Sequence, residues 1–152
     1  MNKKPILMMQ KCIAVILSIT LAIPSYVAAT EIDMVAPCAS YYLDSYQTYV
    51  YPAGSGKVQV WFDVTADNYM DELGALSIWL YESTDNSTWT CVETFHYTEY
   101  SGMLDYDDYS FMGHVDYQGV KGRYYKAYVC IWAGKDGDGD TRYLWTSSKK
   151  AT

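Results

Sequence analysis

RYYKAYVCIWA, residues 123–133, alternates two kinds of side chain with the period of a β-strand. Successive side chains of a strand point to opposite faces, so every second residue shares a face. One face is small or apolar and carries Tyr125, Ala127, Val129 and Ile131. The other carries Tyr124, Lys126, Tyr128, Cys130 and Trp132. This pattern predicts a long strand over Arg123 to Ala133 with one face in a core.

The same period recurs along the chain. Lys57 to Thr65 places Val58, Val60, Phe62 and Val64 on one face. Leu76 to Tyr81 sets Leu76, Ile78 and Leu80 against Ser77, Trp79 and Tyr81. Further strands are predicted at Trp89 to Phe95, Tyr109 to Tyr117 and Thr141 to Ser147, and an edge strand within Ala39 to Tyr51. We expect a polar connection over Asp67 to Gly74 and a hairpin loop over Gly134 to Asp140.

Six or seven short strands, separated by turn residues and without a helical stripe, favour one architecture. We predict an all-β protein, an antiparallel immunoglobulin-like β-sandwich of about seven strands. Its core is expected over residues 57–147. An N-terminal segment with the edge strand, residues 30–56, precedes it, and a polar, frayed tail, residues 148–152, follows.

The segment Gly122 to Val129, followed by a loop and a last strand, resembles the end of a fibronectin type III or immunoglobulin-like domain. The resemblance implies that Tyr125 is the corner tyrosine of that fold, and that Phe62 stands where such folds bury a tryptophan. It extends loosely over Lys57 to Ser147. The whole chain also resembles a family of small exported bacterial proteins without an assigned activity, which implies no catalytic residues.

Residues 1–29 have the three parts of a secretory signal peptide. Lysines begin it, an apolar run from Ile13 to Ile23 follows, and Val27-Ala28-Ala29 supplies small residues at a cleavage position. The apolar run is about half of the roughly 20 residues that a membrane span needs. We therefore expect cleavage after Ala29 and a secreted, extracellular protein without a stable membrane anchor.

Composition narrows the function classes. The 152 residues carry a formal charge of −7 and include 17 Tyr and 5 Trp. An apolar fraction of 50% argues for a folded domain, and the acidic balance argues against nucleic acid as a partner. After cleavage three cysteines, Cys38, Cys91 and Cys130, would permit one disulfide in any of three pairings.

The aromatic residues give the main candidate site. If the strands at 76–81, 123–133 and 141–147 are neighbours in one sheet, their aliphatic faces point inward. Large aromatic side chains then cover the outer face: Trp79, Tyr81, Tyr128, Trp132, Tyr143 and Trp145. Such a patch on a soluble domain marks an interaction site, or the rings stack across strands and stabilise the sheet. Flat rings also stack on the apolar faces of sugars.

The acidic segment Asp136 to Asp140 has two interpretations. Asp136, Asp138 and Asp140 alternate with glycine, and closely spaced carboxylates can bind calcium. The positions that an EF-hand loop fills with Gly and Glu hold Thr141 and Ser147, so an EF-hand is excluded. A simple calcium site is one interpretation, and a solvated hairpin turn is the other.

No catalytic arrangement stands out in the sequence. Its two histidines, His96 and His114, have no defensible spacing to a nucleophile or to metal ligands. We therefore expect a non-enzymatic binding module without a cofactor, whose partner is a glycan or an extracellular protein. The alternatives are a self-assembling structural protein that buries the same face in a homo-oligomer, and a small hydrolase.

Overall fold

Nine β-strands make up most of residues 40–152, the part of the chain that this computed structural model describes. The predicted signal peptide and Cys38 lie outside the described residues. No helix within residues 40–152 has the length and apolar character needed to cross a membrane. The strands are β1 (Leu43–Gly54), β2 (Lys57–Met70), β3 (Glu72–Ser83), β4 (Thr90–His96), β5 (Leu104–Asp105), β6 (Asp108–Gln118), β7 (Tyr124–Lys135), β8 (Asp138–Trp145) and β9 (Lys149–Lys150), with the short 3-10 helix η1 (Ser101–Met103) before β5.

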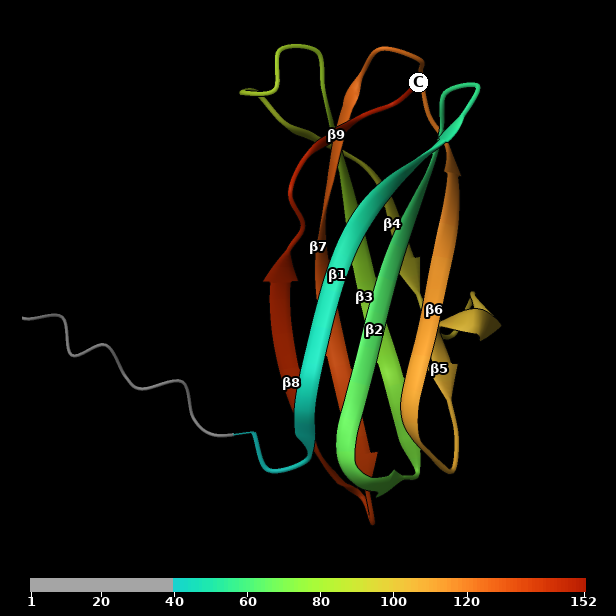
Figure 1. The fold of residues 1–152 in the computed structure, drawn as a ribbon, viewed down its shortest axis with the longest axis vertical. Helices are drawn as coiled ribbons and strands as arrows, with labels where there is room; N and C mark the ends of the chain where they lie inside the picture. The colour runs from blue at the N-terminus through green and yellow to red at the C-terminus, as the bar shows by residue number, and fades with distance from the viewer. Residues whose placement is uncertain (1–39) are drawn as a thin grey trace, which may run out of the picture. The chain divides into compact units, whose positions relative to one another are not determined.

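The strands form two antiparallel sheets that face each other (Figure 1). The smaller sheet has the order β1-β2-β6, and β1 is an edge strand, as the sequence predicts. The larger sheet has the order β4-β3-β7-β8, and the two-residue strands β5 and β9 pair with β3 and β7. Seven long strands in this arrangement confirm the predicted immunoglobulin-like β-sandwich.

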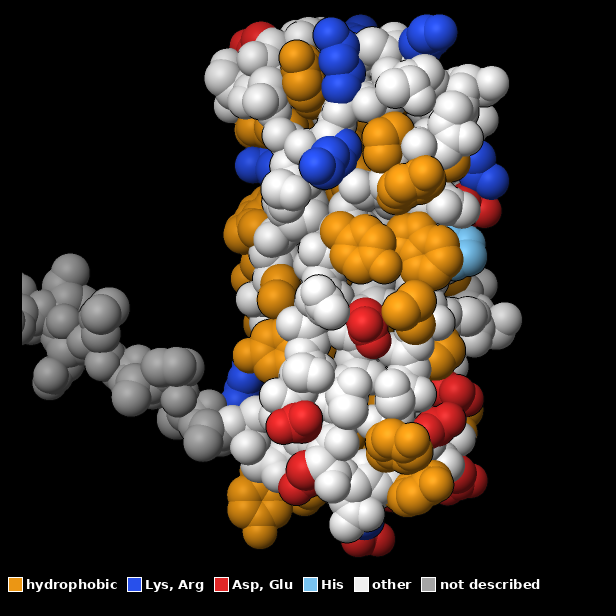
Figure 2. Space-filling view, viewed as in Figure 1, with side chains coloured by type: hydrophobic (Ala, Val, Ile, Leu, Met, Phe, Trp, Pro, Cys, Tyr) orange, Lys and Arg blue, Asp and Glu red, His pale blue; other side chains and the backbone are white. Residues whose placement is uncertain are grey.

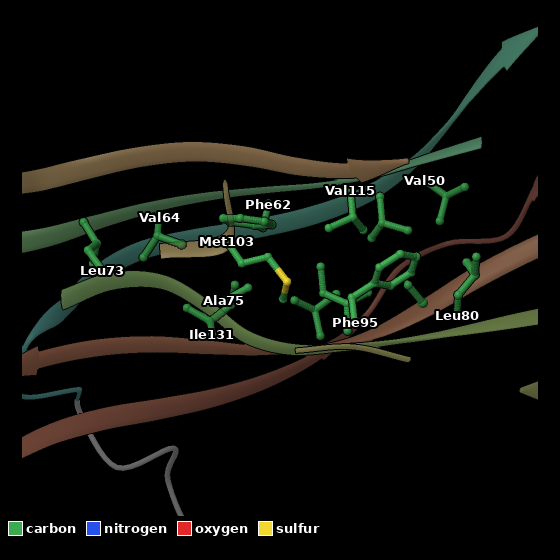
Figure 3. Packing of buried hydrophobic residues seen from close by; sticks show 14 of the residues in the cluster. Val50, Phe62, Val64, Leu73, Ala75, Leu80, Phe95, Met103, Val115 and Ile131 are labelled. Carbon is green, nitrogen blue, oxygen red and sulfur yellow. The ribbon is translucent and has the colours of Figure 1, made fainter. Parts of the chain in front are cut away.

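The core lies between the sheets and is built by the predicted alternation. Val60, Phe62 and Val64 of β2 are fully buried, as are Val129 and Ile131 of β7. Figure 3 shows Phe62, Val64 and Val115 from one layer facing Ala75, Ile131 and Leu80 from the other, with Met103 reaching in between. Each large apolar side chain buried here contributes about 1.5–3 kcal/mol.

Tyr125 occupies the corner position that the resemblance implies. Its side chain is fully buried, and its hydroxyl accepts a hydrogen bond from the Val120 main-chain N–H at 2.8 Å. The hydroxyl donates to the carboxylate of Glu82, which is the cross-strand partner of Tyr125 on β3. Gly119 lies against the ring, where an added Cβ would come within 2.6 Å of the hydroxyl oxygen. The loop before β7 is therefore tied to the core through one phenol.

Strand β3 differs from its predicted course. It begins at Glu72, so most of the predicted polar connection at 67–74 belongs to β2 and β3. A bulge between Ala75 and Ser77 leaves Leu76 only half-buried, and Ala75 faces the core opposite Ile131. Because of the extra residue, Ala75 rather than Leu76 points into the core. Ile78 and Leu80 point inward as predicted.

The tail is ordered, which corrects the prediction of a frayed end. Strand β9 pairs with β7, and Ala151 is 2% exposed. The main-chain N–H of Gly56 donates to the Thr152 carbonyl at 2.8 Å. Main-chain hydrogen bonds do not depend on side-chain polarity, so the polar side chains of this tail do not indicate whether it is paired with a strand.

The β7–β8 hairpin is tighter than the predicted loop at 134–140. Lys135 pairs with Asp138, so only Asp136 and Gly137 connect the strands. Both have positive φ, 53° and 82°, as a two-residue type I′ turn requires. Asp and Gly adopt this conformation readily, which accounts for their presence at the turn.

Candidate functional site

The outer face of the larger sheet carries a row of aromatic rings in direct cross-strand register. Trp79 of β3 pairs with Tyr128 of β7, and Tyr128 pairs with Trp145 of β8. The ring centroids of Trp79 and Tyr128 lie 5.8 Å apart, and those of Tyr128 and Trp145 lie 4.8 Å apart. Residues more than 60 positions apart in the chain therefore form one continuous row.

Two more rings extend the row. Tyr143 stacks on Tyr128 at 5.5 Å, with an interplanar angle of 22°. Tyr81 lies 5.2 Å from Trp145. We call the five residues Trp79, Tyr81, Tyr128, Tyr143 and Trp145 the aromatic face. Each such pair stabilises the sheet by about 0.5–1.5 kcal/mol whether or not a ligand binds.

The aromatic face is open to solvent at its β8 side. Tyr143 is 55% exposed and Trp145 is 52% exposed, whereas Trp79, Tyr81 and Tyr128 are half-buried. None of the five belongs to the buried core. The rings point away from the core, as the alternation predicts, and a ligand can reach them.

A lysine sits within the aromatic face. Lys126 is the cross-strand partner of Tyr81, and its ammonium lies 4.4 Å from the ring centroid of Trp89 and 4.6 Å from that of Trp145. Both distances are typical of cation–π contacts. Trp89, just before β4, was not among the predicted site residues, because sequence spacing did not show that the hairpin returns it to Lys126.

Trp132 lies apart from the aromatic face, which corrects the predicted six-residue surface. Its partner on β8 is Thr141, and its indole N–H donates to Glu72 Oε2 at 3.0 Å. Its ring packs over Gly134 and Gly139, where an added Cβ would come within 2.8 Å of ring atoms. Trp132 lines a separate cleft of about 500 Å³ with Asp71, Glu72, Tyr106, Lys135 and Asp138.

Residues of the acidic segment make hydrogen bonds within the protein. Asp140 Oδ2 accepts hydrogen bonds from Ser40 Oγ at 2.8 Å and from the Tyr42 main-chain N–H at 2.7 Å. Partial burial opposes ionisation of Asp140, but these bonds outweigh it and lower the carboxyl pKa. The main-chain N–H of Asp136 donates to Asp71 at 2.7 Å. Within residues 40–152 no three His, Cys, Asp or Glu side chains are grouped so that they could hold a metal ion. Calcium binding by Asp136, Asp138 and Asp140 stays a prediction.

The structure brings together Ser77 and His96, a pair that the sequence pattern does not predict. Ser77 Oγ lies 3.0 Å from His96 Nδ1, across β3 and β4. A nucleophile of the serine-hydrolase type needs its histidine oriented by a third group, usually a carboxylate. In the described chain no carboxylate is hydrogen-bonded to His96, so the pair forms a surface cross-strand contact.

The structure excludes one of the three disulfide pairings that the sequence permits. Cys91 is exposed and Cys130 is buried, and both are free thiols in this structure. Burial raises the pKa of Cys130, against a hydrogen bond with Tyr143 that lowers it. Of the three pairings that the sequence permitted, Cys91 with Cys130 is not formed.

Comparison with known proteins gives no family. No family model matches the chain, and no curated protein matches it. Among solved structures, the chain is similar to a family 76 glycoside hydrolase from a bovine Bacteroides thetaiotaomicron strain, with 13% identity and a TM-score of 0.30. The match covers 70% of this chain but 20% of that one, so the chain spans about a fifth of its length. A likeness at this level supports no conclusion about activity.

Proposed function

We propose that this protein is an exported, non-catalytic binding module that holds a glycan against the aromatic face. The observation that carries the proposal is the continuous row of five rings, two of them more than half exposed. Tyr and Trp provide wide contact area at low entropic cost and keep a polar group for hydrogen bonding. Exposed aromatic rings in a row suit stacking against the apolar faces of successive sugar rings.

The electrostatics of the face are consistent with this ligand class. Lys126 supplies the positive charge of this surface, and it is held between Trp89 and Trp145. A nucleic-acid site needs several Lys or Arg side chains free for phosphate, and the chain carries a formal charge of −7. An extracellular protein that docks on the same rings, or a second copy of the chain, is the competing occupant.

A glycan array with matched variants tests the proposal. We expect Trp145→Ala and Tyr143→Ala to reduce retention at least tenfold, since both side chains are exposed and their loss leaves the core intact. Tyr69→Ala is the control, because Tyr69 is 60% exposed and pairs with Tyr109 instead. Retention that is unchanged in both aromatic-face variants would reject the site.

Sizing of the same proteins separates the competing occupants. A glycan-binding monomer elutes at one size at all concentrations, with or without Trp145. If the wild-type protein forms a stable dimer that Trp145→Ala dissociates, and the array retains neither protein, the face is an assembly surface.

A further inference from the structure

A second set of stacked rings lies on the outer face of the smaller sheet. Tyr49 of β1, Trp61 of β2 and His114 of β6 are direct cross-strand partners. Trp61 follows the fully buried Val60 and precedes the fully buried Phe62, so strand alternation turns its ring outward. Figure 2 shows hydrophobic side chains gathered over the middle of this sheet, beside a histidine.

The first two rings form a flat platform. The rings of Tyr49 and Trp61 are within 3° of parallel, with centroids 6.3 Å apart, and Trp61 stacks on His114 at 4.3 Å. By contrast, neighbouring rings of the aromatic face are tilted against each other by 22° to 51°. Two nearly parallel rings on neighbouring strands suit stacking against the ring of a ligand better than packing against an aliphatic chain.

The platform belongs to a shallow groove with a mainly apolar lining. Its volume is about 330 Å³, and it is lined by Tyr49, Tyr51, Gln59, Trp61 and Met112. Tyr51 and Met112 are 56% and 55% exposed and flank the platform. This lining, mostly apolar with a few placed polar groups, has the composition that small-ligand sites share, but the groove leaves one side of a ligand open to solvent.

A chain of hydrogen bonds fixes the polar edge of the groove. Trp61 Nε1 donates to Gln59 Oε1 at 3.2 Å, and Gln59 Nε2 donates to Asp116 Oδ1 at 2.8 Å. Lys57 Nζ lies 3.0 Å from the other oxygen of Asp116. The amide therefore sits beside the platform, where it can bond a ligand hydroxyl without a large rearrangement.

Charge decides the ligand class. None of the five lining side chains is a Lys, Arg, His, Asp or Glu. Of the carboxylates beside the groove, Asp116 is paired with Lys57, and Asp63 is the cross-strand partner of Met112. An anionic ligand would lose hydration here without gaining a counter-charge, because Lys57 is already paired, whereas a neutral saccharide needs no counter-charge.

From this geometry we infer that the groove on the smaller sheet is a second binding site, for a neutral saccharide whose ring stacks on Tyr49 and Trp61. The site is independent of the aromatic face, since the two lie on opposite sheets of the sandwich. A domain with a glycan site on each outer face can hold two saccharide chains at once. Gln59 bonds a sugar hydroxyl, and Met112 covers one side of the ring.

Electrophoresis in native gels that contain xylan, mannan, glucan or hydroxyethyl cellulose tests this site. At least one neutral polysaccharide should retard the wild-type protein. Met112→Lys, which puts a charge in the groove at an exposed position, should weaken the retardation at least tenfold. Trp61→Ala should do the same, and its melting temperature shows whether it folds. Tyr109→Ala is the control, an exposed aromatic residue near the start of β6 that does not line the groove.

Trp145→Ala separates the two sites. If Met112→Lys and Trp61→Ala migrate as the wild type while Trp145→Ala loses retardation, the groove is refuted and the aromatic face stands. If Met112→Lys loses retardation and Trp145→Ala keeps it, the groove is supported without the aromatic face. No retardation of the wild type by any of the polysaccharides, or a dimer that Met112→Lys dissociates, would overturn the inference.

Discussion

Trp145 and Tyr128 face each other across β8 and β7, with ring centroids 4.8 Å apart on the solvent side of the larger sheet. The pair joins the half-buried rings of β3 to the exposed edge at β8. The pair therefore stabilises the sheet, and under the proposed function it also contacts the glycan.

Removing the cation from the aromatic face should cost a small, measurable amount of stability. Lys126→Met keeps the length and apolar stem of the side chain but loses its contacts with Trp89 and Trp145. We expect the free energy of unfolding in urea to fall by about 0.5–2 kcal/mol. Lys121→Met, at an exposed loop position, is the matched control. Equal stability of the two variants would show that Lys126 contributes nothing through the rings.

Tyr125→Phe should destabilise the domain and change its response to alkali. The variant leaves Val120 N–H without its acceptor and removes one donor from Glu82, which keeps its hydrogen bond from Arg123, and this costs roughly 1–3 kcal/mol at neutral pH. Burial, reinforced by the hydrogen bond to Glu82, raises the pKa of Tyr125 to about 12. A raised pKa means that the hydroxyl stabilises the folded state fully below about pH 10 and that this is lost as pH rises through about 12.

The difference in unfolding free energy between the wild type and Tyr125→Phe should therefore shrink above pH 10. Denaturant titrations at pH 7, 9 and 11.5 measure it. A difference that stays constant to pH 11.5 would contradict the raised pKa.

Asp85 should make the β3–β4 hairpin sensitive to acid. Its carboxylate accepts hydrogen bonds from the main-chain N–H groups of Thr88 and Ser87 and from Ser83 Oγ, each at 2.8 Å. These bonds hold its pKa far below the ordinary value. A lowered pKa means that the stabilisation is present above about pH 4 and is lost as pH falls through the folded-state value.

Asp85→Asn removes the charge at every pH. We expect its melting temperature to lie below that of the wild type at pH 7 and the two to converge toward pH 2. Thermal melts by circular dichroism test this, with Asp107→Asn as a control in another turn. A gap that is the same at both pH values would contradict the account.

Deleting the tail should destabilise the sandwich. Removal of residues 149–152 breaks the β7–β9 pairing and three further main-chain hydrogen bonds, those that join Gly56 to Thr152, Gly122 to Ala151 and Ala151 to Arg123. At about 0.5–1.5 kcal/mol each, the three further bonds alone account for a loss of about 1.5–4.5 kcal/mol in urea unfolding. Thr152→Ala keeps every one of these bonds and should be neutral. A truncated protein as stable as the wild type would show that the tail adds nothing.

The strands could be predicted because alternation and burial agree. Alternation predicts inward positions in β2 and β7, and every one of these is buried: Val58, Val60, Phe62, Val64, Ala127, Val129 and Ile131. The bulge at Leu76 and the paired tail could not be predicted in the same way. A bulge depends on the register with a distant strand, and β9 is held by main-chain bonds that side-chain pattern does not report.

The candidate site was predictable only in part. The alternation of side chains along each strand predicts that the aromatic residues point outward. It does not show that the Trp132 ring packs on Gly134 and Gly139, or that the Trp89 ring contacts Lys126. The groove on the smaller sheet was missed for a related reason. Tyr49, Trp61 and His114 are far apart in sequence, and the predicted edge strand lacked a register that would align them.

The most direct test of the central claim follows the five tryptophan indole N–H signals by NMR during titration with oligosaccharides of xylan, mannan, cellulose and chitin. Trp→Phe variants assign each signal, and Trp132, tied to Glu72 outside the aromatic face, is the internal reference. We expect a binding sugar to shift the signals of Trp79 and Trp145 together to saturation while the signal of Trp132 stays in place. Sugars that leave the Trp79 and Trp145 signals unmoved at millimolar concentration would refute glycan binding by the aromatic face.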